Sequence, residues 1–163
     1  MAEKDMIVKG ISIKYNSPFN MIDLYNSLKS WFDINRYTFY ETSYDEKATG
    51  DKKSLTIRWV GTKELDDYTQ VELKAEIELN DYEIIKAESE KLTKGKLKLK
   101  FTSLMVTDYE EKWDKNPLSK FFKAISDKYF EANKFSIYKK EIKNDTYDIY
   151  NKTKSFLNLQ KFR

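Results

Sequence analysis

The sequence predicts an α+β fold: a single antiparallel sheet of five to six strands with helices on one face and a long C-terminal helix. Three observations predict it. Apolar residues recur with helical spacing near residues 20–35, alternate from 37 to about 107, and return to helical spacing after 117. Short polar segments separate the alternating stretches, as in an antiparallel meander. At 163 residues, we expect one domain over residues 1–163.

The N-terminal part predicts one strand and one helix. Met6–Tyr15 is expected as a strand, and Gly10 in its middle indicates a bulge or a close backbone approach. Asn20, with Asp23 three residues later, resembles a helix N-cap. That helix is expected to end near Asn35 and to bury one face, made of Met21, Leu24, Leu28 and Trp31/Phe32.

The alternating stretch predicts the rest of the sheet. Gln70–Leu79 shows the clearest pattern, because apolar and polar residues alternate along its whole length. The other expected strands are Tyr37–Tyr44, Ser54–Val60, Tyr82–Ala87 and Lys96–Val106. We expect connections at Asp45–Lys53, Gly61–Asp67 and Asn80–Asp81, and a bulge at Thr102–Ser103.

Two helices are expected in the C-terminal part. Pro117 suits the first turn of a helix that buries residues from Leu118 to Tyr129. A last helix runs from about Phe135 to Leu159, with Phe135, Ile142, Ile149 and Phe156 seven residues apart. This spacing allows a coiled-coil seam, but it covers barely three heptads and Asp145 interrupts it. We therefore favour docking of this helix on the chain's own sheet.

Composition argues against most catalytic chemistry. The chain has no cysteine and no histidine, which excludes thiolate nucleophiles, disulfides, Cys-based metal centres and histidine-dependent catalytic pairs. It lacks a phosphate-binding loop, a dinucleotide fingerprint and a Gly-x-Ser-x-Gly elbow. We therefore expect no enzyme, no catalytic residue, no metal site and no cofactor.

Cellular location is predicted from the lack of membrane and export signals. No apolar run approaches the roughly 20 residues that span a bilayer, and the first residues carry acids rather than an apolar stretch. We expect a cytoplasmic protein that does not contact membranes.

One acidic segment invites a metal interpretation. Residues 108–114 hold four carboxylates, and hard cations prefer clustered oxygen ligands. Their spacing does not match a calcium loop, and no glycine supplies the sharp turn. A solvated loop anchored by Tyr109 and Trp113 is the favoured interpretation, and cation binding stays an open alternative.

Lysines are concentrated in one part of the chain. The net charge is only +3, but residues 86–140 hold 14 lysines against 8 acids. Lys94, Lys96, Lys98 and Lys100 form a positive row on one strand face, which suits a nucleic-acid backbone. Pairing with Glu72, Glu76 and Glu78 on another strand is the favoured interpretation. The chain has 27 lysines and only 3 arginines, which argues against sequence-specific base recognition.

Two tyrosines are candidates for partner contact. Tyr40 and Tyr44 lie on the opposite parity from Phe39, so both are predicted on the solvent face of the sheet. Exposed tyrosines supply contact area at low entropic cost. The predicted partner-contact surface consists of Tyr40, Tyr44, Lys94, Lys96, Lys98 and Lys100.

Short motifs carry two resemblances. Trp59, Asp67-Tyr68, Lys94-Gly95, Asp108-Tyr109-Glu110 with Lys112-Trp113, Pro117 and Phe156-Leu157 resemble a family of small uncharacterised archaeal or archaeal-virus proteins across residues 6–160. That resemblance implies such a source but brings no known activity or site residues. The element order is also similar to the helix-grip fold of START-like binders of lipids and other hydrophobic ligands. This resemblance implies a pocket between sheet and C-terminal helix, although the single first helix and the extra helix near Pro117 depart from the pattern.

Three functions remain open. The favoured one is a non-catalytic protein-interaction or structural subunit, acting through aromatic and helical surfaces on a protein partner or on a second copy. The alternatives are a START-like binder of a hydrophobic small molecule and a lysine-mediated nucleic-acid-associated protein.

Overall fold

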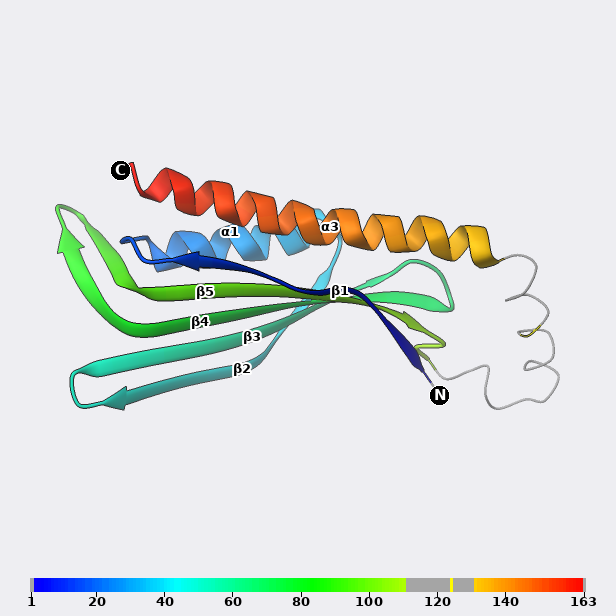
Figure 1. Cartoon of the computed structure of the whole chain (residues 1–163), viewed down its shortest axis with the longest axis horizontal. Helices are drawn as coiled ribbons and strands as arrows, with labels where there is room; N and C mark the ends of the chain where they lie inside the picture. Colours follow the sequence, from blue (N-terminus) through cyan, green and yellow to red (C-terminus); the bar gives the residue numbers. More distant parts are fainter. Residues whose placement is uncertain (1, 111–123, 125–130, 163) are drawn as a thin grey trace.

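The chain forms one antiparallel sheet with helices on one face. The computed structural model describes residues 2–110, 124 and 131–162. The elements in order are β1 (Glu3–Tyr15), α1 (Met21–Ile34), β2 (Thr38–Thr49), β3 (Lys52–Glu64), β4 (Thr69–Ala87), β5 (Glu90–Thr107) and α3 (Glu131–Gln160). The sheet has five strands in the order β1-β5-β4-β3-β2, all antiparallel (Figure 1). The predicted fold class is confirmed, whereas the helix predicted after Pro117 lies outside the described residues.

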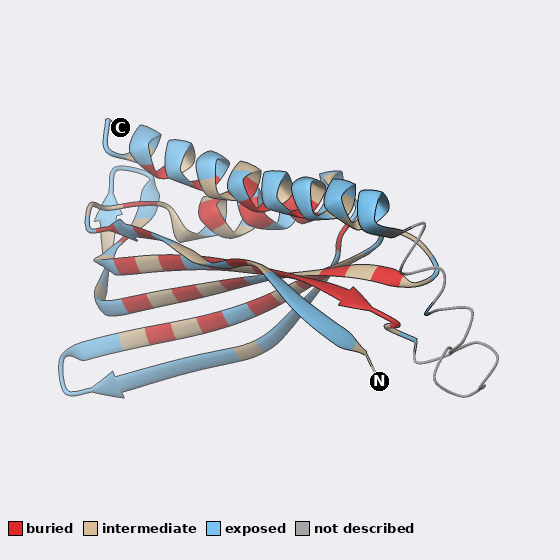
Figure 2. Cartoon of the chain, turned by 45° about the vertical axis from the view of Figure 1, so that its right-hand side comes forward, coloured by how far each residue is buried: buried red, intermediate tan, exposed pale blue. Residues whose placement is uncertain are grey.

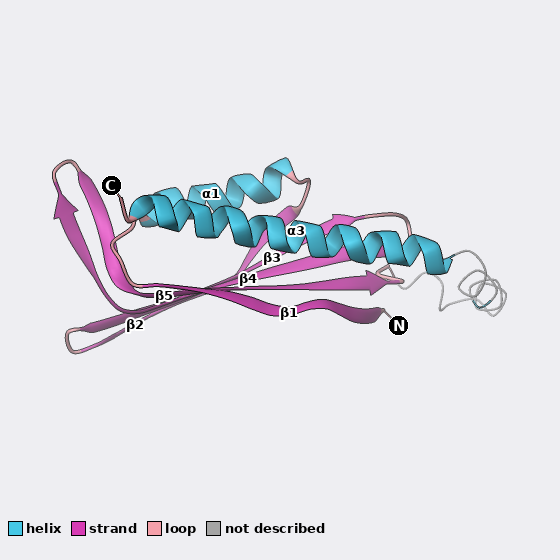
Figure 3. Ribbon diagram, turned by 45° about the horizontal axis from the view of Figure 1, so that its top comes forward, coloured by secondary structure: helices cyan, strands magenta, loops and turns pink. Residues whose placement is uncertain are grey.

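Both helices cover the same face of the sheet, as Figures 1 and 3 show. Buried residues alternate along β3, β4 and β5, because every second side chain points into the layer beneath the helices (Figure 2). Ile142, Ile149 and Leu157 of α3 are at most 1% exposed and belong to this core. Helix α3 contacts β1 and β5, so the predicted docking on the chain's own sheet is confirmed.

Helix α1 forms as its sequence predicts. The Asn20 side chain accepts a hydrogen bond from the Asp23 backbone N–H at 3.1 Å, which satisfies one of the free donors of the first turn. The buried face consists of Leu24, Leu28, Trp31 and Phe32. The connection predicted at Gly61–Asp67 begins too early, because β3 continues to Glu64. A Cβ atom at Gly61 would lie 2.4 Å from Phe32 Cε1, so glycine allows α1 to approach β3.

The connection between β2 and β3 is much shorter than predicted. The loop expected at Asp45–Lys53 is wrong, because the strands pair without a break from Ser43↔Arg58 to Thr49↔Lys52. Only Gly50 and Asp51 form the turn, and Gly50 has the φ of +62° that a tight hairpin requires. Residues at the end of this hairpin are exposed, so their polarity imitates a loop in the sequence.

Strand β4 continues through the turn expected at Asn80–Asp81. The register with β5 shifts there, between Asn80 and Glu83, and Asp81 takes a φ of +51°. The segment from Tyr82 to Ala87 therefore belongs to β4 and not to a sixth strand. Beyond this point the β4–β5 hairpin bends toward the helices (Figures 1 and 3), and Thr93 of β5 exchanges backbone hydrogen bonds with Phe19.

The irregularity expected in β5 lies in the neighbouring strand β1. The register between β4 and β5 is unbroken from Thr69↔Thr107 to Asn80↔Lys96, so the bulge predicted at Thr102–Ser103 is wrong. Register shifts occur in β1 between Met6 and Ile11, around Gly10 with its φ of +105°. The irregularity predicted at Gly10 is confirmed. Leu104 and Val106 break the apolar alternation because side chains on both faces are buried at that end of β5.

Candidate functional site

The structure separates the two tyrosines of the predicted contact surface. Tyr40 pairs with Val60 and faces outward, on the side of the sheet opposite α1 and α3. Tyr44 pairs with Ile57, a core residue, and so faces the helix side. A register shift between Glu41 and Ser43 causes the difference, because one extra residue reverses the side to which the following side chains point. The prediction that both tyrosines share the solvent face is therefore wrong.

The predicted lysines share the outer face with Tyr40, whereas Tyr44 lies on the helix side. Lys96, Lys98 and Lys100 alternate with the buried leucines of β5 and therefore face outward. Their neighbours across the β4–β5 ladder are Asn80, Glu78 and Glu76, and Lys94 stands opposite Glu83. Strands β3 and β4 separate these lysines from β2. The six predicted residues therefore do not form one surface.

Large apolar side chains are exposed on the helix side of the sheet, toward the end that holds the β2–β3 and β4–β5 turns. Ile22, Tyr44 and Ile84 are 71%, 56% and 62% exposed, and we call them the hairpin-end surface. Ile84 stands opposite Thr93, which bonds to Phe19 just before α1. This chain of contacts places Ile84 near the start of α1, where Ile22 lies.

Tyr82 connects this end of β4 to the edge of the sheet near Tyr44. Its hydroxyl group donates to Glu46 Oε1 at 2.5 Å, so its side chain reaches from β4 across β3 to β2. Burial and the nearby Glu46 carboxylate raise the pKa of Tyr82 to about 12. Sequence reasoning missed Ile22 and Ile84. The sequence did contain a signal for Ile22, because this isoleucine lies outside the apolar stripe of α1 and is therefore expected to be exposed.

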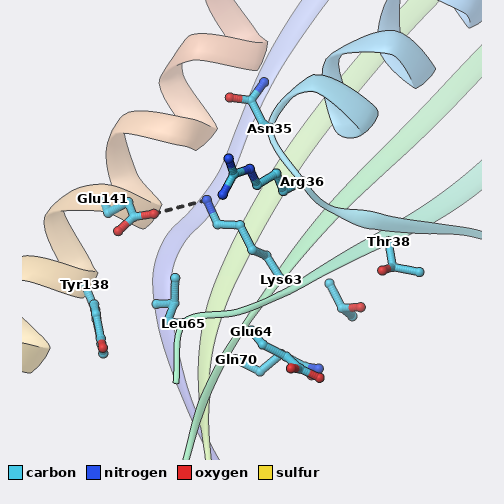
Figure 4. Close-up of a pocket in the computed structure, with 10 residues that line it drawn as sticks. Asn35, Arg36, Thr38, Lys63, Glu64, Leu65, Gln70, Tyr138 and Glu141 are labelled. Carbon is cyan, nitrogen blue, oxygen red and sulfur yellow. Dashed lines mark ion pairs between the residues drawn. The ribbon is translucent and has the colours of Figure 1, made fainter. Parts of the chain in front are cut away.

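A polar pocket lies near the other end of α1, between the α1–β2 connection, β3 and α3 (Figure 4). Its volume is about 610 Å³, and the residues that line it are Asn35, Arg36, Thr38, Thr62, Lys63, Glu64, Leu65, Gln70, Tyr138 and Glu141. The helix-grip resemblance implies an apolar pocket under the C-terminal helix. The helix–sheet layer is instead filled by Ile142, Ile149 and Leu157, and this pocket has a polar lining. That lining suits a polar ligand better than a hydrophobic one.

Lys63 is the centre of a partly buried charge cluster at this pocket. It follows Trp59 and Gly61 on the core-facing parity of β3, so its side chain enters the layer between sheet and α3. Its Nζ lies 3.1 Å from Glu141 Oε1 and 2.8 Å from Asp145 Oδ2. Its ammonium group also lies 4.8 Å from the centre of the Tyr37 ring.

Asp145 binds two groups from the sheet side at once. Besides Lys63, it accepts a hydrogen bond from the Tyr37 hydroxyl at 2.7 Å. Burial, together with this carboxylate, raises the pKa of Tyr37 far above its ordinary value. Both carboxylates and the aromatic ring engage the Lys63 ammonium group, so we interpret the cluster as a link between α3 and the sheet. Arg36 also faces the pocket, and the described residues give it no ion pair (Figure 4).

A second link joins α3 to the β3–β4 connection. Asp66 accepts hydrogen bonds from the backbone N–H groups of Tyr68 at 2.9 Å and Thr69 at 2.6 Å. It also accepts one from the Tyr138 hydroxyl at 2.9 Å and pairs with Lys134. Burial acts to raise the pKa of Asp66, but Lys134 and these hydrogen bonds outweigh it and lower that pKa.

The described ranges contain neither a cluster that could hold a metal ion nor a helix that could span a membrane. Within residues 2–110, 124 and 131–162, no group of three or more acidic, histidine or cysteine residues converges on a common point. Of the acidic segment 108–114, residues 111–114 lie outside the described part. Asp108 is buried at the end of β5, and its backbone N–H donates to Tyr68 O at 2.8 Å. No helix in these ranges is both long and apolar enough to cross a bilayer.

Comparison with known proteins gives no further constraint, because no protein-family model, curated protein or solved structure matches this chain.

Proposed function

We propose that this chain is a non-catalytic protein-interaction module that binds its partner through the hairpin-end surface. One observation carries the proposal: Ile22, Tyr44 and Ile84 are each more than half exposed. Tyr44 and Ile84 stand opposite the buried residues Ile57 and Thr93 on the helix side of the sheet, and Ile22 lies in the first turn of α1. Full burial of one such side chain contributes about 1.5–3 kcal/mol. Several large apolar side chains exposed on one side of a molecule favour a protein contact, whereas isolated ones carry no such meaning.

The free edge of the sheet supports the same location. Strand β2 is an edge strand, so the backbone groups on its outer side have no neighbouring strand among the described residues. An extended partner segment can pair with such an edge, and beside Tyr44 it would also cover apolar area. Glu41 and Glu46 lie on the same face as Tyr44, since they pair with Trp59 and Leu55 of the core. A partner with apolar and basic side chains fits this edge.

Tyr40 provides a matched control for the experiment. It has the same exposure as Tyr44, 56%, and lies on the same strand but faces the other way. A photo-crosslinking amino acid is placed at position 44 or at position 40 in the full chain, which is then expressed in its native source. We expect a discrete protein adduct from position 44 and none from position 40.

Light scattering of the purified full chain tests the alternative in which the partner is a second copy. A mass above that of the monomer that falls to the monomer value in Tyr44→Ser, but not in Tyr40→Ser, supports the proposal. A monomer that also gives no adduct at position 44 beyond that at position 40 contradicts it.

A further inference from the structure

The outer face of the sheet carries no helix among the described residues, and its cations are concentrated on β1 and β5. Its rows across the strands follow from the register; one row runs Ser43–Arg58–Glu76–Lys100–Ser12 and the next runs Asp45–Thr56–Glu78–Lys98–Lys14. Strands β1 and β5 contribute Lys14, Lys98 and Lys100 to these two rows and no carboxylate.

Three neighbouring lysines on this face form no ion pair with a carboxylate among the described residues. Lys14 of β1 stands directly opposite Lys98 of β5, and Lys100 follows Lys98 on the same face of β5. We call Lys14, Lys98 and Lys100 the outer lysine patch. Like charges placed opposite each other destabilise a sheet, so a bound polyanion would relieve a repulsion that is built into β1 and β5.

The carboxylates nearest to the patch, Glu76 and Glu78, stand opposite Lys100 and Lys98 but form no ion pair with them, although Arg58 and, to a smaller extent, Lys100 lower the pKa of Glu76. Glu76 stands opposite Lys100, but it accepts a hydrogen bond from Arg58 Nε at 2.7 Å. That hydrogen bond is the main reason why the pKa of Glu76 is lowered. Lys96 does find a partner, since its Nζ lies 3.1 Å from Asp81 Oδ2. Of the three glutamates predicted to pair with lysines, Glu76 and Glu78 do stand opposite Lys100 and Lys98, whereas Glu72 stands opposite Leu104.

A shallow pocket of about 320 Å³ continues the patch across the sheet. Its lining includes Lys100, Lys74 and Arg58, together with the hydroxyl-bearing Thr42 and Thr102. It also includes the Glu76 carboxylate, which is bound to Arg58. The ammonium, guanidinium and hydroxyl groups are donors from which phosphate oxygens accept hydrogen bonds. Tyr40 lies on the same face, beside the pocket residue Val60, and exposes a ring on which a base can stack.

We infer that the outer face of the sheet binds the backbone of single-stranded nucleic acid without sequence preference. Alternate residues of a strand are about 7 Å apart, so consecutive lysines of β5 can meet consecutive phosphates of an extended strand. Lysine contacts phosphate as a point charge and lacks the planar fork of arginine, so it gives little base discrimination.

A membrane surface fits this face less well than a nucleic acid does. The neighbours of Lys100 are Ser12 and Glu76, and Lys98 lies beside Glu78. Binding to a bilayer surface normally adds apolar side chains to the basic ones, and these neighbours are polar.

Gly10 links the bulge of β1 to this surface. A Cβ atom at position 10 would lie only 2.8 Å from Lys100 Cε, so the stem of Lys100 lies over the glycine. Position 10 also requires glycine because its backbone φ is +105°. The irregularity in β1 thereby provides the space in which Lys100 lies.

The test measures fluorescence anisotropy of a labelled oligothymidylate with the full chain. The patch variant is Lys14→Gln/Lys98→Gln/Lys100→Gln. The control variant is Lys29→Gln/Lys140→Gln/Lys143→Gln, which has the same net charge and changes three exposed helix lysines that make no ion pair in the described part. We expect the patch variant to bind at least about tenfold more weakly at low salt and the control to stay within about twofold. The slope of log K against log salt should fall by about 2 in the patch variant alone.

Further measurements test the role of Tyr40, the integrity of the fold and the kind of ligand. Tyr40→Ser should weaken binding several-fold at every salt concentration, because stacking does not depend on counterion release. Circular dichroism melting of each variant shows whether the fold is kept. Equal losses in the two triple variants overturn the inference, and so does the absence of binding to the wild type. Tighter lysine-dependent binding to phosphatidylserine vesicles or to polyglutamate overturns it as well.

Discussion

Lys63 of β3 and Asp145 of α3 form a partly buried ion pair, with 2.8 Å between Nζ and Oδ2. Their side chains are 15% and 18% exposed. Asp145 is the residue that interrupts the apolar seven-residue spacing of α3, and this pair explains the interruption. A charged residue at this position of the helix meets a lysine on the core-facing parity of the strand, so each gives the other a partner.

Removal of the Asp145 carboxylate is predicted to destabilise the fold markedly. Asp145→Ala leaves the buried Tyr37 hydroxyl without its acceptor and leaves Lys63 with Glu141 alone. We expect the free energy of unfolding to fall by about 2–4 kcal/mol, measured by urea denaturation.

Asp5→Ala is the matched control for that experiment. Asp5 pairs with Lys139 of the same helix at 2.7 Å, but about half of each side chain is exposed. Exposed pairs contribute little, so the loss should stay below about 1 kcal/mol. Equal losses in Asp145→Ala and Asp5→Ala would show that the Asp145 cluster is no stronger than a surface ion pair.

Close packing between α1 and β3 predicts that Gly61 tolerates no side chain. In Gly61→Ala the new methyl group meets Phe32, and both the helix and the strand are held by the core around them. We expect the free energy of unfolding to fall by about 1–3 kcal/mol, again measured with urea. Gly50→Asn is the control, because position 50 has open space and asparagine accepts a positive φ. A wild-type midpoint for Gly61→Ala would contradict the packing.

The sequence predicted the elements whose burial follows a simple period. The alternation of Gln70–Leu79, the cap at Asn20 and the stripe of α3 all reappear in the structure, because each depends on one buried face. Exposed hairpins carry no such signal. The polar residues of Asp45–Lys53 lie at the exposed end of the β2–β3 hairpin, where backbone pairing and not a buried face sets their structure.

The candidate sites depend on single-residue irregularities that the sequence does not mark. One extra residue near Thr42 places Tyr40 and Tyr44 on opposite faces, although their spacing of four predicts one face. The Lys63–Asp145 contact joins β3 to α3 across the core, and nothing local to either residue indicates the other. Gly10 is the exception, because a glycine inside a strand commonly marks a bulge or a close backbone approach.

Alkaline stability is predicted to depend on Tyr82. Its pKa is raised to about 12 by burial and by Glu46, so ionisation of this tyrosine is harder in the folded chain than in the unfolded one. Its contribution to stability is complete below the ordinary value of 10.0 and is lost as the pH rises through the folded pKa. We expect Tyr82→Phe to lose less stability than the wild type between pH 10 and 12. Urea midpoints measured across this range test the difference, and parallel profiles would contradict it.

Acid stability is predicted to depend on Asp66. The pKa of this carboxyl is lower in the folded chain than its ordinary value of 3.8, because Lys134 and the Tyr68, Thr69 and Tyr138 hydrogen bonds outweigh the opposing effect of burial. The stability it contributes is therefore present above pH 3.8 and is lost as the pH falls through the folded pKa. Asp66→Asn should be less stable than the wild type at neutral pH, and the gap should narrow below pH 3.8. Asp67→Asn is the neighbouring control, since Asp67 is exposed and makes none of these contacts. A gap between Asp66→Asn and the wild type that stays constant from neutral pH into the acid range would show that the charge of Asp66 does not stabilise the link to α3.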